Sequence, residues 1–414
     1  MVLRKSVLIC LSTIGLILSS GCKESQFDGE DPGNDTYSIE IGEFTSLNNA
    51  KSYRLQLDKK IAEQGRIQKV NDRLYRVMLV KYRTSFEAGK DAYRFYRDSL
   101  IESYSIFRNG KETVDEFRNI LFTANYDGRP SVYSFDLLTK RMKVFWSRWG
   151  NEVISLNNSK DRRGAFITSA LSFGKRGGLS YILDVHVYYL NRDADYTEEV
   201  GDLGDGTQLY TYWEKEDTFK VNITTIDSIN SRTIRQEIYP FSSFGKAEKT
   251  RVRNFDLLKE GFPSPPKRNP VLISPNNRFQ LRQVISGINN YLYLKDVPEK
   301  SEELISSSKR KISDARWSDD GNYLFVITEN KITARPSKKT EPTGELIVID
   351  AKQKKRVMTF GGFRFANLLV QGNFLFFDKR LNEISQIGIY DFELNKFYHT
   401  ISIPGGCGLF NMPM

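Results

Sequence analysis

The feature that most constrains the fold is a pattern of short strands that is repeated along the chain. An apolar strand is followed by a polar turn, a second strand that ends in Asp or Asn, another polar turn and a third strand. One copy occupies residues 120–146, a second spans 315–360 and a third spans 368–401. Because one small sheet of this kind cannot bury both of its faces, the copies must pack against one another.

The residue that closes the second strand of each copy gives the spacing of the repeat. Successive closing residues are separated by gaps of 36 to 69 residues. Repeats of roughly 40 to 50 residues with about four strands each are typical of a β-propeller. We therefore predict an all-β fold, a β-propeller with seven blades on this spacing and six to eight within its range. The closing residues are Asp98, Asp136, Asn191, Asp227, Asp296, Asp350 and Asp391.

We interpret the closing aspartates as turn formers, because an Asp side chain can accept a hydrogen bond from the backbone two residues on. Calcium binding is the alternative role. Two stretches depart from the strand pattern: residues 47–64 are expected to hold a helix, and residues 85–103 suit either a helix or a strand. Residues 35–44 are expected to pair with the last blade, and the C-terminus is expected to help close the ring.

Residues 1–21 read as a signal peptide. Arg4 and Lys5 give a short positive region, and the twelve residues Val7 to Leu18 form an apolar segment. This segment is too short to cross a hydrocarbon core about 30 Å thick, and its length suits a cleaved leader. Residues 22–35 are rich in charge, Gly and Pro and are expected to form a flexible tether. The propeller domain is then expected to span residues 36–414.

The end of the leader resembles the lipobox of bacterial lipoproteins. Leu18 is followed by Ser19, Ser20, Gly21 and Cys22, with the leucine one place further out than in the usual phrase. The resemblance implies that the Cys22 thiol receives diacylglycerol, that a peptidase cuts before it, and that the freed amino group can take an acyl chain such as palmitate. It implies a lipid-anchored protein of the cell envelope, and we favour the outer over the inner membrane.

Three phrases in the repeats resemble those of TolB-like propellers, within the wider WD40-like class. Residues 318–326 (SDDGNYLFV) and 274–282 (SPNNRFQLR) are similar to the Ser-Pro-Asp-Gly turn phrase of that family. Residues 122–139 (FTANYDGRPSVYSFDLLT) are similar to its longer phrase, in which Asp-Gly precedes a strand that ends in Asp. The resemblance covers about half of the chain. It implies a propeller fold and packing of Trp317 between blades, and it implies no particular activity.

Signatures of catalysis are missing from the sequence, which has no HExxH, GxSxG, GxGxxG or GxxxxGK[ST] phrase. Its two histidines, His186 and His399, cannot build a three-histidine zinc site and are interpreted as strand residues. Loss of the leader leaves Cys407 as the one thiol besides Cys22, so no disulfide is expected within the domain. We predict no catalytic residue, no metal and no cofactor. The loop carboxylates weighed as acid/base candidates and interpreted as solvated rim groups are Asp202, Asp205, Glu214 and Glu216.

Candidate binding residues come from aromatic residues near arginines that could be exposed, and from the longest interval between closing residues, Asp227 to Asp296. We expect residues 244–268 to protrude there and to contact a partner, since long insertions can carry recognition. Sheet packing of the aromatics, and an insertion without a role, are the alternatives. The candidates are Trp149, Trp213, Arg251, Arg253, Lys267 and Arg268.

The sequence therefore predicts a membrane-anchored lipoprotein whose propeller acts as a non-enzymatic binding or scaffold domain. The alternative is a carbohydrate-active hydrolase or lyase, which needs carboxylates that converge at the central funnel. The net charge is +10 with its basic residues scattered, so no nucleic-acid partner is expected. The expected partners are the membrane, through the lipid anchor, and an envelope protein or glycan; the oligomeric state is left open.

Overall fold

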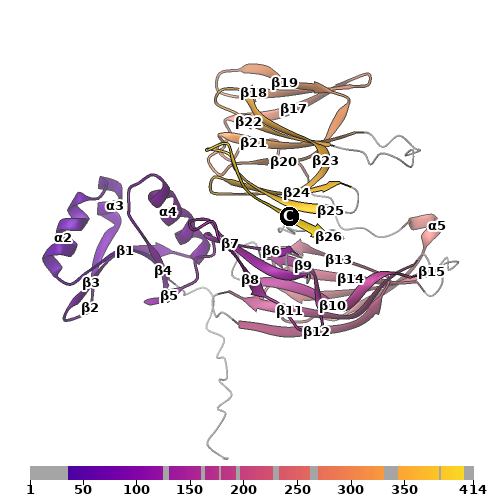
Figure 1. Cartoon of the computed structure of the whole chain (residues 1–414), viewed down its shortest axis with the longest axis horizontal. Helices are drawn as coiled ribbons and strands as arrows, with labels where there is room; N and C mark the ends of the chain where they lie inside the picture. The colour runs from indigo at the N-terminus through magenta and orange to yellow at the C-terminus, as the bar shows by residue number, and fades with distance from the viewer. Residues whose placement is uncertain are drawn as a thin grey trace, which may run out of the picture.

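The computed structural model describes residues 36–404 apart from 125–129, 160–163, 177–178, 193–195, 227–232, 262–268, 331–343 and 382–383. Most of these residues lie in antiparallel β-sheets (Figure 1). The proposed signal peptide, Cys22, the tether and residues 405–414 lie outside the described part. Among the described residues, no helix is both long and apolar enough to cross a bilayer.

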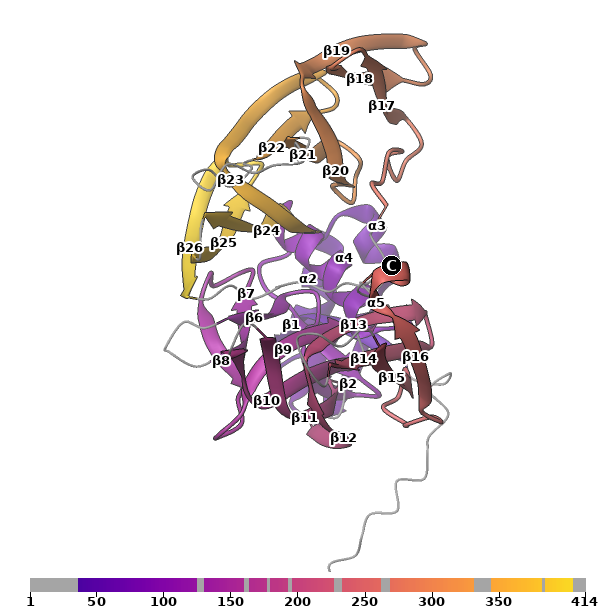
Figure 2. The same cartoon turned by 90° about the vertical axis from the view of Figure 1, so that its right-hand side faces the viewer.

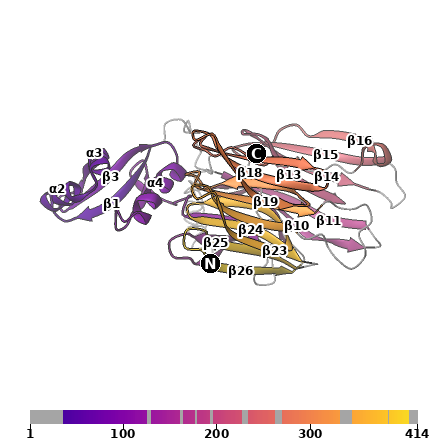
Figure 3. The same ribbon diagram turned by 90° about the horizontal axis from the view of Figure 1, so that it is seen from above.

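Residues 37–113 form an N-terminal unit that is not a propeller blade, which corrects the expectation that the propeller begins at residue 36. Its five-stranded sheet has the order β2-β3-β1-β4-β5, and helices pack against it around Ile39, Val77 and Ala88 (Figures 1 and 3). Its elements are β1 (Tyr37–Phe44), α2 (Leu47–Gln56), α3 (Lys59–Gln64), β2 (Gly65–Asn71), β3 (Leu74–Tyr82), α4 (Ser85–Arg97), β4 (Ser105–Arg108) and β5 (Lys111–Thr113).

Two further expectations fail in this unit for the same reason. Strand β1 pairs with β3 and β4, so it does not close a ring with the last blade. Asp98 is the C-cap of α4 and not a turn between strands, which removes one of the seven repeat units. The Thr84 side chain caps the start of α4, and Ala88 and Ala92 bury one face of it. The helix expected in residues 47–64 is confirmed as the pair α2 and α3.

The rest of the described chain forms antiparallel sheets of a β-propeller, which we divide into six blades. The last two belong to one seven-stranded sheet and share the long strand β23. Blade 1 contains β6 (Asn119–Ala124), β7 (Ser131–Asp136) and β8 (Met142–Trp146), and blade 2 contains β9 (Glu152–Asn158), β10 (Gly164–Arg176), β11 (Leu179–Asn191) and β12 (Tyr196–Gly206). Blade 3 contains β13 (Gln208–Lys215), β14 (Thr218–Thr225), β15 (Thr233–Ser242) and β16 (Arg251–Asp256), followed by α5 (Leu257–Glu260), and blade 4 contains β17 (Phe279–Ser286), β18 (Asn289–Asp296) and β19 (Ser301–Ser308). Blade 5 contains β20 (Arg310–Trp317), β21 (Tyr323–Asn330), β22 (Gly344–Asp350) and β23 (Lys355–Gln371), and blade 6 contains β23, β24 (Phe374–Leu381), β25 (Ile384–Asp391) and β26 (Lys396–Pro404).

The blades pack face to face through five buried apolar clusters that join them in one series. One cluster joins blade 4 to blade 5 and another joins blade 5 to blade 6. A third joins blade 6 to blade 1, so the first and last blades are neighbours. Two more join blade 1 to blade 2 and blade 2 to blade 3. No such cluster of described residues joins blade 3 to blade 4, and Figure 2 shows the blades as an arc with an opening there.

Four of the aspartates that close the repeats form the turns that the sequence predicts, and Asp227 lies outside the described residues. Asp136 Oδ1 accepts hydrogen bonds from the backbone N–H groups of Leu138 and Thr139 at 2.8 and 2.9 Å. Asp391 Oδ1 accepts in the same way from the two residues Glu393 and Leu394. In four blades the residue four positions after the closing aspartate has a left-handed φ, which completes the same turn. These residues are Lys140, Lys300, Lys354 and Asn395.

The two Ser-Pro-Asp-Gly-like phrases also adopt one common turn. The Ser274 hydroxyl accepts from the N–H of Phe279 at 2.9 Å, and the Ser318 hydroxyl accepts from the N–H of Tyr323 at 2.9 Å. Trp317 is buried between blades 4 and 5, and its indole N–H donates to the Val271 carbonyl at 2.9 Å. The packing implied by the family resemblance is therefore confirmed for this tryptophan.

Candidate functional site

The opening of the arc leaves each of its two end blades with one face outside the apolar clusters. In blade 4, Phe279, Leu281 and Leu292 point into the cluster shared with blade 5. Because side chains alternate along a strand, their neighbours lie on the opposite face. We call this opposite surface the blade 4 end face; it carries Gln280, Arg282, Tyr291, Tyr293, Lys295, Glu302 and Leu304.

The blade 4 end face presents aromatic and charged groups to solvent. The Arg282 guanidinium lies 5.5 Å from the centre of the Tyr293 ring, and its Nε donates to Glu302 Oε1 at 2.7 Å. Leu304 is 49% exposed and pairs directly with Tyr293 across the strands. The tyrosines are half-buried. Half-buried Tyr and Arg beside an exposed apolar residue match the composition of protein-binding surfaces.

The blade 3 end face lies on the other side of the opening and is more polar. Tyr210 and Tyr212 stack with their ring centres 6.0 Å apart, and the Gln236 amide donates to the Tyr210 hydroxyl at 2.9 Å. In this face Asn222 and Thr224 are buried, and the Thr224 Oγ1 atom has no hydrogen-bond partner among the described residues. Unsatisfied buried groups of this kind are costly, so this face is not an ordinary apolar blade contact.

Two of the six candidate binding residues lie on the blade 3 end face. Arg251 and Arg253 are exposed on β16, opposite Ile238 and Gln236 of β15. The segment that contains them, residues 244–268, was expected to protrude, and part of it is regular sheet. Residues 251–256 are the fourth strand of blade 3, because their backbone groups pair with β15 along six residues.

The other candidates fall in different places. Trp213 is 3% exposed within the apolar cluster shared by blades 2 and 3, so it supports the sheet and cannot meet a partner. This placement favours the alternative, sheet packing, over a binding role for Trp213. Trp149 is 85% exposed in the turn between β8 and β9, where it is available for contact. Lys267, Arg268 and the lipidation site Cys22 lie outside the described residues.

A pocket of about 250 Å³ lies where α4 meets the turns of blades 5 and 6. Its charged groups pair across this junction: Lys90 with Asp319 at 3.2 Å, and Arg97 with Glu393 at 3.3 Å. The Tyr93 hydroxyl donates to Asn373 Oδ1 at 2.6 Å. Burial raises the pKa of Glu393, and Arg97 acts against this rise. The pocket is therefore lined by ion pairs in which opposite charges neutralise each other, and these pairs hold α4 against the propeller.

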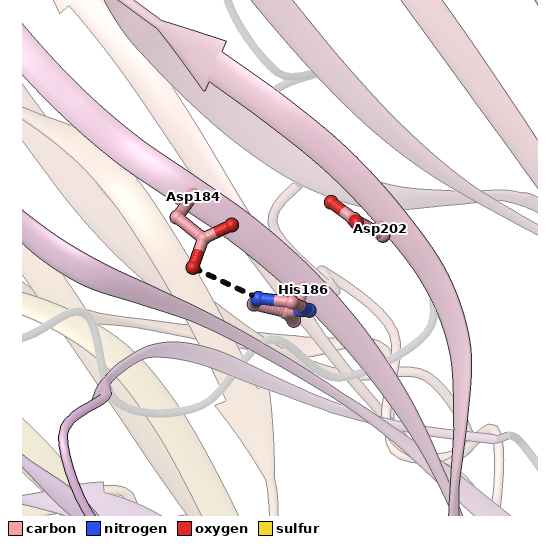
Figure 4. Close-up of side chains that lie close together, drawn as sticks. All are labelled: Asp184, His186 and Asp202. Atoms are coloured by element: carbon pink, nitrogen blue, oxygen red, sulfur yellow. Dashed lines mark ion pairs between the residues drawn. The ribbon is translucent and has the colours of Figure 1, made fainter.

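One group of side chains in the described residues has the donor atoms to hold a metal ion. Asp184, His186 and Asp202 come together on strands β11 and β12 of blade 2 (Figure 4). The sequence placed His186 on a strand, as observed, and treated Asp202 as a rim group. It did not connect the two, because their contact depends on the register of a long hairpin with unequal strands.

Sequence reasoning also missed Arg282 and Tyr293, which are central to the blade 4 end face. Their alternation with Leu281 and Leu292 was a usable signal for a two-faced sheet. It gave no sign that one face lacks a neighbouring blade, because that depends on where the arc opens.

No family model matches the chain, and no curated protein is significantly similar to it in sequence. Its fold is similar to solved structures at low identity. TolB from Acinetobacter baumannii is 12% identical, with 84% of this chain and 80% of that one covered and a TM-score of 0.33. A putative TolB from Agrobacterium tumefaciens is 15% identical, with 71% and 93% covered and a TM-score of 0.32. The periplasmic gluconolactonase of Pseudomonas aeruginosa is 11% identical, with 70% and 98% covered and a TM-score of 0.36. The chain is thus a mostly β protein with propeller blades, an assignment that rests on its own sheets and turns.

Proposed function

We propose that the chain is a cell-envelope lipoprotein, anchored through Cys22, whose propeller binds an envelope partner without catalysing a reaction. The blade 4 end face is the observation that carries this proposal. It combines an exposed leucine, two half-buried tyrosines and an arginine on one rigid sheet. Aromatic side chains and Arg are enriched among the residues that contribute most to protein binding, and Tyr buries a large area at little entropic cost.

The anchor and the outer-membrane location are parts of the same proposal. They rest on the Leu18-to-Cys22 phrase and on the polar composition of residues 23–35, which would hold the folded domain away from the lipid. A flexible tether lets a surface on the propeller meet a partner at variable distance from the membrane. The end face can therefore act as an interaction surface wherever the anchor is inserted.

The alternative is a carbohydrate-active envelope enzyme, and the pocket beneath α4 is the best candidate for its active site. Two of the carboxylates there, Asp319 and Glu393, bind Lys90 and Arg97. A general acid needs a carboxyl group that is free to deliver its proton to the substrate. The paired charges suit adhesion of α4 better than acid catalysis, so we rank the enzyme second.

The test compares cross-linked partners recovered from cell envelopes by the wild-type protein and by Leu304→Glu. A charge on this face should reduce recovery by about tenfold, which corresponds to about 1.4 kcal/mol of binding free energy. Leu171→Glu is the matched control, since Leu171 is 50% exposed on β10 while Leu304 is 49% exposed on β19. Both variants should keep the wild-type melting temperature. Equal recovery by all three proteins would contradict the assigned face, and turnover of a glycan by the purified protein would favour the enzyme.

A further inference from the structure

The hairpin of β11 and β12 gathers a histidine and two aspartates on one side of blade 2. His186 lies directly opposite Asp202 across the two strands. Asp184 has a left-handed φ of 55° at an irregularity in the pairing, and its Oδ2 lies 3.2 Å from His186 Nε2 (Figure 4). One atom from each of the three side chains lies within 4.8 Å of the other two.

The other nitrogen of the imidazole is held by a separate carboxylate. His186 Nδ1 lies 2.7 Å from Glu199 Oε1. Glu199 Oε2 accepts from Arg148 at 2.8 Å and from the Tyr188 hydroxyl at 3.1 Å, so the carboxylate is fixed on both sides. A carboxylate at one ring nitrogen orients the ring and leaves the other nitrogen as a ligand, as in many metal sites. The nitrogen left as a ligand here is Nε2, which lies 3.2 Å from Asp184 Oδ2.

The two aspartates have few partners in the described residues that could neutralise their charge. The Asp202 side chain has no hydrogen bond or ion pair with any described residue, and the carboxylate of Asp184 pairs with His186 alone. Asp205 adds a third carboxylate, because its Oδ1 accepts from the backbone N–H of Asp184 at 2.8 Å. Crowded carboxylates favour a bound cation. This excess charge is independent of the ring geometry and points to the same kind of ligand.

We propose that Asp184, His186 and Asp202 bind one divalent transition-metal ion, with zinc as the best fit. A set of one imidazole nitrogen and two carboxylates suits zinc better than magnesium or calcium, which prefer oxygen ligands alone. Both aspartates are exposed, so the ion has access and the side chains are free to close on it. Glu199 is a positioning residue in this proposal and does not touch the ion. The site is separate from the end faces and does not depend on the proposed function.

The test titrates the full-length mature protein, in detergent and stripped with EDTA, with zinc chloride alone by calorimetry. We expect one saturable site whose affinity falls by at least about tenfold in His186→Gln and in Asp202→Asn, the scale of effect typical of lost ligand or supporting contacts. Glu198→Gln is the matched control, because Glu198 is exposed on the same strand β12 and pairs with Tyr189 instead of the cluster. Its affinity should equal that of the wild type.

Nuclear magnetic resonance of the imidazole groups gives a second readout, since the chain has only two histidines. Zinc should shift the Nε2 signal of His186 and leave that of His399 in place. Glu199→Gln should weaken zinc binding and change the tautomer of His186 in the metal-free protein, which a merely structural residue would not do. Absence of saturable binding, or equal affinity in the wild type, His186→Gln and Asp202→Asn, would overturn the proposal and mark any bound ion as adventitious.

Discussion

Replacing Phe376 by alanine is expected to lower the free energy of unfolding by about 3–5 kcal/mol, the usual cost of removing a fully buried Phe side chain. Phe376 is fully buried in the cluster that joins the last blade to the first, with its ring centre 5.8 Å from that of Phe135. The loss should be large because the cavity opens between two sheets far apart in sequence, and neither sheet can collapse alone to fill it.

Denaturant unfolding of the purified domain measures this loss. Phe173→Ala is the matched control, because Phe173 is 42% exposed on β10 and little apolar area is lost with it. A cost below about 1 kcal/mol for Phe376→Ala would show that blades 1 and 6 do not share a closed core.

Replacing Cys22 by alanine is expected to abolish incorporation of labelled lipid and to release the protein from the membrane fraction. The thiol is the acceptor in the proposed modification, so no other atom of residue 22 can replace it. A single acyl chain gives only marginal membrane binding and two or three chains hold firmly, so loss of the acceptor should change the anchoring completely. Metabolic labelling with a palmitate analogue, followed by membrane fractionation, measures both effects.

The matched controls for this experiment are Cys10→Ala and Cys407→Ala, which remove the other two cysteines of the chain. Both variants should be labelled and fractionate as the wild type does. Persistent labelling of Cys22→Ala would show that lipid is attached elsewhere, and the lipoprotein proposal would then be wrong.

The blades were predictable because their signals are local. Alternating apolar residues, and the aspartate that closes the second strand of each repeated copy, act over a few residues. The side chain of Asp136 or Asp391 forms its turn with its immediate neighbours. The buried Trp317 was predictable for a similar reason, since its phrase includes the turn that follows it.

The N-terminal unit was not predictable from the same signals. Strands such as 37–41 and 73–82 are apolar and β-branched whether they pair in a blade or beneath helices. The difference is made by α4, whose sequence contains Phe86, Tyr93 and Phe95 and therefore does not look strongly helical. It becomes a helix because Thr84 caps it and its small residues pack on the sheet.

The candidate site was recovered only in part, since function here depends on contacts across the sheet. Arg251 and Arg253 were chosen for charge and do lie on an exposed face. Trp213 was chosen for its aromatic neighbours, but in an alternating strand it falls on the buried side while Tyr210 and Tyr212 take the other. Which side is covered depends on the neighbouring blade, and this information is not in the strand itself.

The contact between the first and last blades divides the arc into two groups of blades, which we call its arms. One arm holds the N-terminal unit with blades 1 to 3 and the other holds blades 4 to 6, and the chain passes directly from one to the other only between α5 and β17. The apolar cluster around Phe376 is then the pivot between the two arms. Helix α4 stabilises this pivot, because Lys90 and Arg97 of the first arm form ion pairs with Asp319 and Glu393 of the second. A small rotation of the arms about this pivot would displace the blade 3 and blade 4 end faces the most, because these faces lie farthest from the pivot.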